Sequence, residues 1–390
     1  MPTIKFSTVK SVSEIGAHDW NTCACPEVFE GNRPVDPFTS YKFLSALEQS
    51  GSVGPNTGWI PNHIVAKKDS EVVAVMPFYI KTHSQGEYIF DHNWSYAYNS
   101  SGGNYYPKLQ SAVPFTPVTG RRFLQKRGLE LDFSHGLVEA AIEIAKGNHL
   151  SSLHITFCTD EEVSRSDRLN LLRRLSLQYQ WINKGYKDFD DFLSALNHRK
   201  RKAIKKERKT ALDFGGKIVA LNGDEIKLGH WDYFWDFYQD TGARKWGTPY
   251  LNRSFFNHLH EDFRDDLLLI IAEKKGVPIA GALNFLGRSA LFGRYWGCSE
   301  NHSCLHYELC YYQAIDYAIR KGLEKVEAGA QGDHKLARGY LPKITNSMHW
   351  FLNEHFSDAV GRYIEEEATL IVEQYNQFKE QGPFKSENET

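Results

Sequence analysis

The amino-acid sequence predicts an α+β fold, a mix of helices and strands arranged as two domains that repeat one plan. Its 390 residues exceed what one hydrophobic core usually serves. Residues 64–80 read as a strand, a polar turn and a strand, and residues 270–286 repeat that pattern 206 positions later without a gap. A helix-period stretch and one more strand follow each copy, with the helices centred on 141–145 and 314–318. We therefore expect two tandem domains, each with a mostly antiparallel sheet flanked by helices.

The composition is that of an ordinary globular protein. The chain has 46 Lys and Arg against 48 Asp and Glu, a net charge of −2, and 41% hydrophobic residues. This near-neutral total excludes a generally cationic nucleic-acid protein and an acidic disordered chain. No apolar run approaches the ~20 residues of a membrane span, and the first residues lack the apolar stretch of a signal peptide, so we expect a cytoplasmic protein.

The cysteines do not predict a metal site. Six cysteines in a chain of this length do not form a disulfide framework. Cys298, Cys304, His306 and Cys310 lie close in sequence, but they lack the paired short spacings of a structural zinc site. We therefore expect no bound metal.

The first half carries extra chain. Its hairpin and helix lie farther apart than those of the second half by 33 residues, which places an insertion at about 81–127. The predicted boundaries are 1–185 for the first domain, 186–378 for a basic linking helix and the second domain, and 379–390 for a polar tail. The insertion is rich in Gly, Pro and aromatic residues, which indicates an ordered segment. It is either a lid that packs on its own domain or a wall of the acceptor site. Its candidate cleft residues are Lys81, His83, Tyr98, Tyr105 and Tyr106.

One helix concentrates positive charge. Residues 188–196 begin an amphipathic helix with an acidic first turn, which is predicted to continue through 198–209, where eight residues are basic and one is acidic. A solvated charged face is the simplest interpretation, but like charges at this density repel one another, which favours an anionic partner such as a nucleotide or a tRNA backbone. The predicted phosphate-binding residues are Arg199, Arg201, Lys202 and Lys205. A second candidate anion site combines Arg244 and Lys245 beside Trp246.

The run from 327 to 340 is the most distinctive loop of the second half. It leaves a strand and places Gly, Gln, Asp, His, Lys and Arg within a dozen positions. His334 is the natural general base, with Asp333 or Glu308 as alternatives acting through water. Lys335 is the candidate for stabilising an oxyanion, Arg338 for holding an anion, and Gln331 for lining the cleft. The alternative is a strand-end loop held by its own ion pairs.

These segments resemble a known group of enzymes. The order of helices, three strands, a helix and a strand, found twice, is similar to the tandem GNAT-type fold of Fem-type peptidyltransferases. Arg-Lys-Arg-Lys-Ala-Ile-Lys-Lys at 199–206 and the helix that starts Leu-His-Tyr-Glu at 305 resemble their basic and motif-bearing helices. The runs at 81–91, 105–120 and 329–339 resemble a family of N-acyltransferases described for peptidoglycan biosynthesis or recognition.

The resemblance implies transfer of an acyl or aminoacyl group to an amine, such as that of a cell-wall precursor. It implies no resident cofactor, with aminoacyl-tRNA or acyl-CoA as the donor substrate. Asn301-His-Ser-Cys304 stands where CoA-binding relatives carry a Gln/Arg-x-x-Gly-x-Gly/Ala loop. Two alternatives stay open: a non-catalytic module that binds a peptidoglycan precursor or RNA, and an acyl-CoA-dependent N-acetyltransferase.

Overall fold

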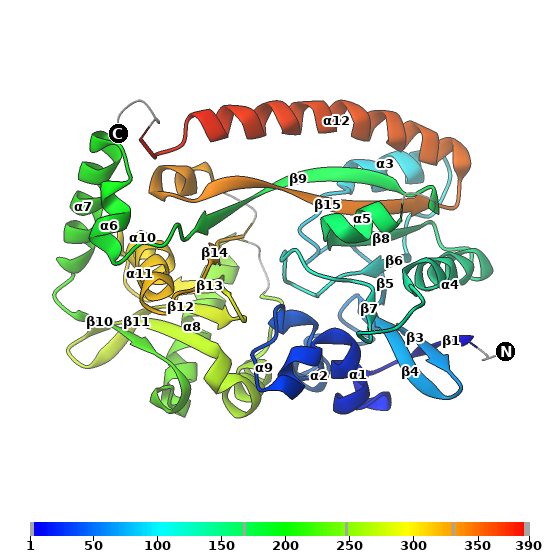
Figure 1. Cartoon of the computed structure of the whole chain (residues 1–390), viewed down its shortest axis with the longest axis horizontal. Helices are drawn as coiled ribbons and strands as arrows, with labels where there is room; N and C mark the ends of the chain where they lie inside the picture. Colours follow the sequence, from blue (N-terminus) through cyan, green and yellow to red (C-terminus); the bar gives the residue numbers. More distant parts are fainter. Residues whose placement is uncertain (1–3, 167–168, 246–248, 330–331, 386–390) are drawn as a thin grey trace. The chain divides into compact units, whose positions relative to one another are not determined.

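The chain forms two compact units (Figure 1). This computed structural model describes residues 4–166, 169–245, 249–329 and 332–385, without the side chains of 243–245 and 333. Unit 1 combines residues 1–177 with 344–373, and unit 2 combines 178–343 with 374–390. The sequence prediction had assigned 344–373 to the second domain. The chain thus passes between the units three times, within strand β9, strand β15 and helix α12.

Unit 1 contains two sheets, one ordered β1-β3-β4-β7 and the other with β2-β5-β6-β8-β15 side by side. Its strands are β1 (Ile4–Val9), β2 (Trp59–Pro61), β3 (His63–Lys68), β4 (Glu71–Met76), β5 (Tyr79–Lys81), β6 (Lys108–Ser111), β7 (Leu124–Gln125), β8 (Ser152–Cys158) and most of β15 (Leu341–Phe351). Its helices are α1 (Ala17–Ala24), α2 (Tyr41–Gln49), α3 (His92–Ser100), α4 (Ser134–Gly147), α5 (Asp160–Arg165) and the first part of α12 (Glu354–Glu380).

The two faces of the second sheet of unit 1 differ in chemistry. One face carries Leu109, Leu153 and Ile155, which pack with Leu137 and Ala141 of α4 in an apolar core. Because side chains alternate along a strand, the residues between them point to the opposite face. That face carries buried Lys, Gln, His, Ser and Thr side chains, and an aromatic cluster from α3 and α12 lies over part of it. The predicted insertion is therefore more than a lid, since β6 itself is a strand of this sheet.

Unit 2 has one sheet, in the order β10-β11-β12-β13-β14-β9. Its strands are the end of β9 (Leu172–Ile182), β10 (Lys217–Leu221), β11 (Leu267–Lys274), β12 (Val277–Leu286), β13 (Ala290–Cys298) and β14 (Lys325–Glu327). Its helices are α6 (Phe189–Ser194), α7 (His198–Leu212), α8 (Leu228–Lys245), α9 (Arg253–His258), α10 (Leu305–Tyr307) and α11 (Gln313–Arg320). Residues 267–272 are buried without interruption because apolar side chains cover both faces.

The predicted repeat is confirmed at the level of individual residue pairs. Ala66 pairs with Ala74 in unit 1, and Ala272, 206 positions after Ala66, pairs with Ala280 in unit 2. Both hairpins shift register directly after the first alanine, between Ala66 and Lys67 and at the equivalent place in unit 2. Both turns also use left-handed backbone at equivalent positions, with φ of 75° at Ser70 and 79° at Gly276.

The predicted basic helix is interrupted. The helix expected over 188–209 is divided into α6 and α7, because Asn197 starts a new helix by accepting a hydrogen bond from Lys200 N. Near this break, Leu196 forms an isolated β-bridge with Phe384, which belongs to the predicted polar tail.

Candidate functional site

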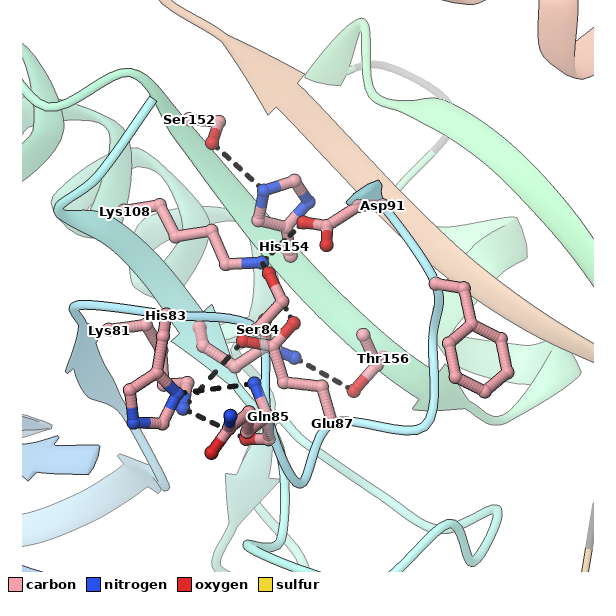
Figure 2. Close-up of polar contacts among 12 residues, drawn as sticks. Lys81, His83, Ser84, Gln85, Glu87, Asp91, Lys108, Ser152, His154 and Thr156 are labelled. Atoms are coloured by element: carbon pink, nitrogen blue, oxygen red, sulfur yellow. Dashed lines mark hydrogen bonds and ion pairs between the residues drawn. The ribbon is translucent and has the colours of Figure 1, made fainter. Parts of the chain in front are cut away.

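The polar face of unit 1 is built from neighbouring strands. Lys81 of β5 pairs with Lys108 of β6, Gln110 of β6 with His154 of β8, and His154 with His349 of β15. Residues directly opposite each other in a sheet point to the same side, so these five side chains share one face. All five are buried. Figure 2 shows the loop 83–91 bringing Ser84, Glu87 and Asp91 onto this face.

Lys108 is the hub of this cluster. Its Nζ donates three hydrogen bonds, to Ser84 Oγ at 2.8 Å, Glu87 Oε2 at 2.8 Å and Asp91 Oδ2 at 2.5 Å. Burial alone would lower the pKa of Lys108, but the carboxylates of Glu87 and Asp91 outweigh it and raise the pKa above its usual value. Lys108 in turn holds the pKa of Asp91 below its usual range against the effect of burial. Lys108 is therefore a fixed cation.

Lys81 and Glu87 form a weaker pair beside it. Lys81 Nζ lies 3.8 Å from Glu87 Oε1, 3.3 Å from Gln85 O and 3.8 Å from the centre of the Trp59 ring. Burial lowers the pKa of Lys81 to about 7 and raises the pKa of Glu87 to about 7. Both groups therefore change charge near neutral pH, which is the property expected of residues that exchange protons with a ligand.

The half-buried rim of the cluster holds His83, Ser84 and Tyr106. Ser84 Oγ lies 2.8 Å from Tyr106 Oη, and the His83 ring lies 3.1 Å from Thr57 O. A Cβ at position 58 would lie 2.0 Å from His83 Nε2, so Gly58 is required for this packing. The five cleft residues predicted from the insertion are thus brought together: Lys81 joins the cluster directly, Tyr105 donates to Asp91, Tyr98 packs on Tyr105, and His83 and Tyr106 form the rim.

Sequence reasoning missed the residues that organise this site. Glu87 and Asp91 lie within the run that carries the family resemblance, but their charge roles were not predicted. Lys108 and His154 lie in strands, and strand periodicity would have placed them on one face with Lys81. No local sequence pattern could have predicted the role of His349. It lies beside His154 because β15, which carries it, pairs with β8, and the two histidines are 195 residues apart in the sequence.

Unit 2 offers an open pocket at the end of β13. Its volume is about 220 Å³, and it is lined by Thr241, Trp296, Cys298, Glu300, Asn301, His302, Leu305 and His306. The pocket follows from the way two strands part. β13 pairs in parallel with β14 only over residues 290–292, although β13 runs on to Cys298. The loop after β13 then leads into α10.

The strand-end loop of unit 2 lies beside this helix. His334 is exposed, and its Nε2 lies 2.9 Å from Tyr311 Oη. His306, which lines the pocket, lies 6.3 Å from His334 between ring centres. Lys335 is buried and donates to the carbonyls of Ala328 at 2.6 Å and Gly329 at 3.3 Å. Among the described side chains of this loop, the imidazole of His334 is exposed, whereas Lys335 and Arg338 are buried.

Two further predicted residues are engaged in ion pairs. Arg338 donates to both carboxylate oxygens of Glu207, at 3.1 and 2.8 Å, and its guanidinium stacks 3.5 Å from the centre of the Tyr307 ring. Glu308 is fully buried and accepts from Arg208 and Gln313. The Arg208–Glu308 pair fastens α7 to the helical segment that follows α10, and the Arg338–Glu207 pair fastens α7 to the strand-end loop. An anion at Arg338 would have to compete with Glu207.

The basic residues of α7 divide by direction. Glu207 and Arg208 face inward with Ile204, whereas the predicted residues Arg199, Lys202 and Lys205 are exposed and Arg201 is half-exposed. Lys205 lies 3.5 Å from Asp190, with both side chains mostly exposed, and such a pair contributes little. The outward face of α7 therefore keeps its positive charge available to an anionic partner.

The remaining predicted residues are not described. Trp246 and Gln331 lie outside the described residues, as do the side chains of Arg244, Lys245 and Asp333. Among the residues that are described, no group of three or more His, Cys, Asp and Glu side chains is placed to hold a metal ion. Within the same part of the chain, no helix is long and apolar enough to cross a membrane.

Comparison with known proteins identifies the class. A FemAB-like family model, described for peptidoglycan biosynthesis or recognition, matches residues 11–386. The chain therefore belongs to this FemAB-like family. A search among curated proteins finds no match.

Solved structures agree with this fold. FemX is 14% identical over 86% of this chain and 97% of its own, with a TM-score of 0.50. The C-terminal domain of a protein from Agrobacterium fabrum named as a lysylphosphatidylglycerol synthetase is 8% identical over 89% of this chain and 96% of its own, with a TM-score of 0.54. A tandem GNAT protein of clavulanic acid biosynthesis is 10% identical over 90% of this chain and 99% of its own, with a TM-score of 0.46. The chain has the α+β fold of two units that was predicted, and the order of hairpin, strand, helix and parallel strand occurs in both units.

Proposed function

We propose that this protein is an N-acyltransferase that moves an aminoacyl group from tRNA to the amine of a cell-wall precursor or peptide. The observation that carries the proposal is the open pocket where β13 runs on beyond its pairing with β14. It lies beside an exposed imidazole and a helix with a cationic outer face. Such a transfer needs a place for the activated carbonyl of the donor, a base and a surface that binds phosphates. The pocket, the imidazole and the outer face of α7 are the candidates for these three roles.

The lining of the pocket favours aminoacyl-tRNA over acyl-CoA as the donor. The loop from 299 to 304, where CoA-binding relatives hold a pyrophosphate, contains the carboxylate of Glu300. That carboxylate lies 2.8 Å from both Lys274 Nζ and His302 Nε2, so the ammonium of Lys274 is already paired. A pyrophosphate would meet a negative group there, whereas the outer face of α7 offers Arg199, Lys202 and Lys205 to a polynucleotide backbone.

The proposed reaction forms one bond and breaks one. The lone pair of the acceptor amine attacks the ester carbonyl carbon, and a C–N bond forms. His334 takes the proton that the amine nitrogen releases, and the oxyanion forms near the positive charge of Lys335 at the end of β14. When the intermediate collapses, the C–O bond to the ribose breaks and the ribose oxygen receives a proton. The polar face of unit 1 is the proposed binding site of the acceptor.

The direct test is a transfer assay with the full-length protein. Total tRNA charged with radiolabelled amino acids is incubated with nucleotide-linked wall precursors, and the label is followed into the precursor. One or a few charged tRNAs should donate, and acetyl-CoA should not. Label transfer from acetyl-CoA alone would instead favour the acyl-CoA-dependent enzyme, and binding without any transfer would favour a non-catalytic module.

Two variants separate the proposed roles. His334→Ala should lower the rate by about 10²–10⁴-fold if the imidazole is the base, whereas His135→Ala, an exposed histidine on α4, is the control. The double variant Lys202→Glu/Lys205→Glu should weaken tRNA binding and reduce its salt dependence. Its charge-matched control is Lys5→Glu/Lys67→Glu, which changes two exposed lysines on β1 and β3 of unit 1. Equal losses in test and control variants would contradict these assignments.

A further inference from the structure

The polar face of unit 1 has more acceptors than donors. Four buried atoms have no hydrogen-bond partner among the described residues: Glu87 Oε1, Asp91 Oδ1, Gln110 Oε1 and His349 Nε2. Asp91 Oδ1 and Gln110 Oε1 can only accept, and Glu87 Oε1 accepts whenever its carboxyl group is ionised. An unsatisfied buried acceptor destabilises a fold, so a concentration of them on one face calls for an explanation.

Most donors near these atoms are already committed, and Lys81 Nζ reaches Glu87 Oε1 only as an ion pair at 3.8 Å. The three N–H groups of Lys108 go to Ser84, Glu87 Oε2 and Asp91 Oδ2. The hydroxyl of Tyr105 donates to Asp91 Oδ2 at 2.7 Å, and Gln110 Nε2 donates to Thr156 Oγ1 at 3.0 Å. None of these bonds reaches the second oxygen of either carboxylate.

The fourth atom is also an acceptor, because its neighbours fix the histidine tautomers. Ser151 donates its proton to the carbonyl of Tyr105, so the contact of 3.1 Å between the Ser151 and Ser152 hydroxyls uses the proton of Ser152. His154 Nε2, 2.9 Å from Ser152 Oγ, must then carry a proton and donate it. The same tautomer follows from Tyr105, whose oxygen lies 3.3 Å from His154 Nε2 and whose proton goes to Asp91.

His349 completes the chain. His154 Nδ1 is left with a lone pair, so His349 Nδ1, at 2.7 Å, donates to it. Burial lowers the pKa of both histidines well below the usual value, which keeps them neutral. His349 Nε2 is therefore a bare lone pair. Each of the four atoms can therefore accept a hydrogen bond from a bound donor, and Lys81 offers one of them, Glu87 Oε1, only an ion pair at 3.8 Å.

We propose that this face binds a protonated primary ammonium of the acceptor, a group separate from the amine that attacks the donor, and that Glu87, Asp91 and Gln110 hold it. A primary ammonium brings three N–H donors and a positive charge, which matches two carboxylate oxygens and an amide oxygen. This inference rests on the proposed function in one respect only, the identification of the ligand as the acceptor of the transfer. His349 Nε2 lies farther along the same face and accepts another N–H or O–H of the same molecule.

Charge balance adds a measurable consequence. Two lysines and two carboxylates already cancel, so an entering ammonium adds a positive charge to a buried site. Lys81 and Glu87 are the groups able to give up a proton, because burial brings the pKa of each to about 7. The groups that face Lys81 are Glu87, Lys108, Asp91 and His83, together with the Trp59 ring and Gln85 O. Binding of a cation should therefore release a proton from Lys81 or Glu87 to the solvent.

The test uses the full-length protein and three small probes. Propylammonium carries charge and donors, tetramethylammonium carries charge without donors, and 1-propanol carries a donor without charge. Binding is measured by isothermal titration at pH 7, in two buffers of different ionisation enthalpy so that released protons can be counted. Of the three probes, only propylammonium should bind, with the release of up to one proton. If no probe binds, or if 1-propanol binds as well as propylammonium, water satisfies the acceptors and the proposal is wrong.

Variants locate the site. Glu87→Gln should weaken propylammonium binding by at least about tenfold, since it removes a charge-assisted hydrogen bond. Its control is Glu162→Gln, another buried carboxylate of unit 1, which accepts from the backbone of Arg122 and Phe123. Lys81→Met should keep binding and reduce proton release to the share that Glu87 contributes. Thermal unfolding of each variant confirms that it is folded, and equal weakening by Glu87→Gln and Glu162→Gln would overturn the assignment.

The two proposals fail in different ways. If propylammonium binds as described but no charged tRNA supports transfer, the amine site stands and the transferase function falls. If transfer occurs and folded Glu87→Gln leaves the KM of the acceptor unchanged, the transferase stands and the amine site falls.

Discussion

The two units share a hairpin and diverge in what they do with the sheet beside it. In unit 2, apolar side chains cover both faces of the sheet, and the candidate reactive groups gather at strand ends next to an open pocket. In unit 1, α4 covers one apolar face, and the other face is polar, buried and rich in charge. The insertion accounts for this difference, because it supplies β6, the loop 83–91 and α3. One plan thus gives an accessible site in one unit and an enclosed one in the other.

Removing the hub of the enclosed site should give the largest effect. Lys108→Met leaves Glu87 and Asp91 buried with their main cation gone, and breaking a buried ion pair costs about 3–5 kcal/mol. The measurement is the free energy of unfolding in urea. Lys126→Met removes an exposed pair with Glu71 and is the matched control, expected to cost under about 1 kcal/mol. Similar values for the two variants would mean that the cluster is solvated.

The equivalent change in unit 2 should be smaller. Arg208→Met removes the partner of fully buried Glu308, but the side chain of Arg208 is 25% exposed and Gln313 still donates to the carboxylate. We expect a loss of about 2 kcal/mol, below the range for a fully buried pair. Lys205→Met, which removes the exposed pair with Asp190, should change stability by under about 0.5 kcal/mol. A loss in Arg208→Met as large as that in Lys108→Met would remove the distinction between the units.

The enclosed site should also respond to pH. The pKa of Glu87 is raised from 4.5 to about 7, so between these values the folded state holds more protons and stability falls as pH rises. The pKa of Lys81 is lowered from 10.5 to about 7, so between 7 and 10.5 the unfolded state holds more protons and stability rises with pH. Together, the two groups should give the free energy of unfolding a minimum near pH 7, about 1–3 kcal/mol below its value at more acidic or more alkaline pH. Lys81→Met/Glu87→Met should flatten the stability profile measured by urea unfolding from pH 5 to 9.

The shared hairpin predicts the smallest effects, with opposite signs. Ser70 and Gly276 occupy the same turn position with φ of 75° and 79°. Ser70→Gly should stabilise the protein by about 0.5–1 kcal/mol, because glycine adopts this conformation without strain, and Gly276→Ser should destabilise it by about 1 kcal/mol. Differential scanning calorimetry measures both shifts. The same sign for both would show that the turns are not equivalent.

The repeat could be predicted from the sequence. That each unit is built from two separate stretches of the chain could not. The hairpins and the helices that follow them were predictable because alternation and helical period are local properties. The division of the basic helix at Asn197 was not predicted. The helical spacing of apolar residues continues across Asn197 and hides its role as the N-cap of a new helix. The return of 344–373 to unit 1 depends on strand pairing over long sequence distances, which no local pattern encodes.

The candidate site divides in the same way. The insertion residues Lys81, Tyr105 and Tyr106 were predicted from composition and resemblance, and the structure brings them together. Their partners Lys108 and His154 were missed, because a charged or polar residue inside a strand looks like a surface position until the other face is known to be buried. The roles of His334 and Lys335 stay predictions that the transfer assay tests.

Because the chain passes between the two units three times, unit 1 cannot be completed before most of unit 2 has been synthesised. During synthesis, β8 of unit 1 emerges almost two hundred residues before β15, the strand that pairs with it. Residues 178–343 of unit 2 are made in that interval, so the edge of β8 waits without its neighbour while unit 2 assembles. A fragment that ends at residue 177 would keep this exposed edge permanently and would lack His349. We therefore expect that residues 1–177 do not fold as an independent domain. A fragment that represents unit 1 needs residues 344–373 joined to them.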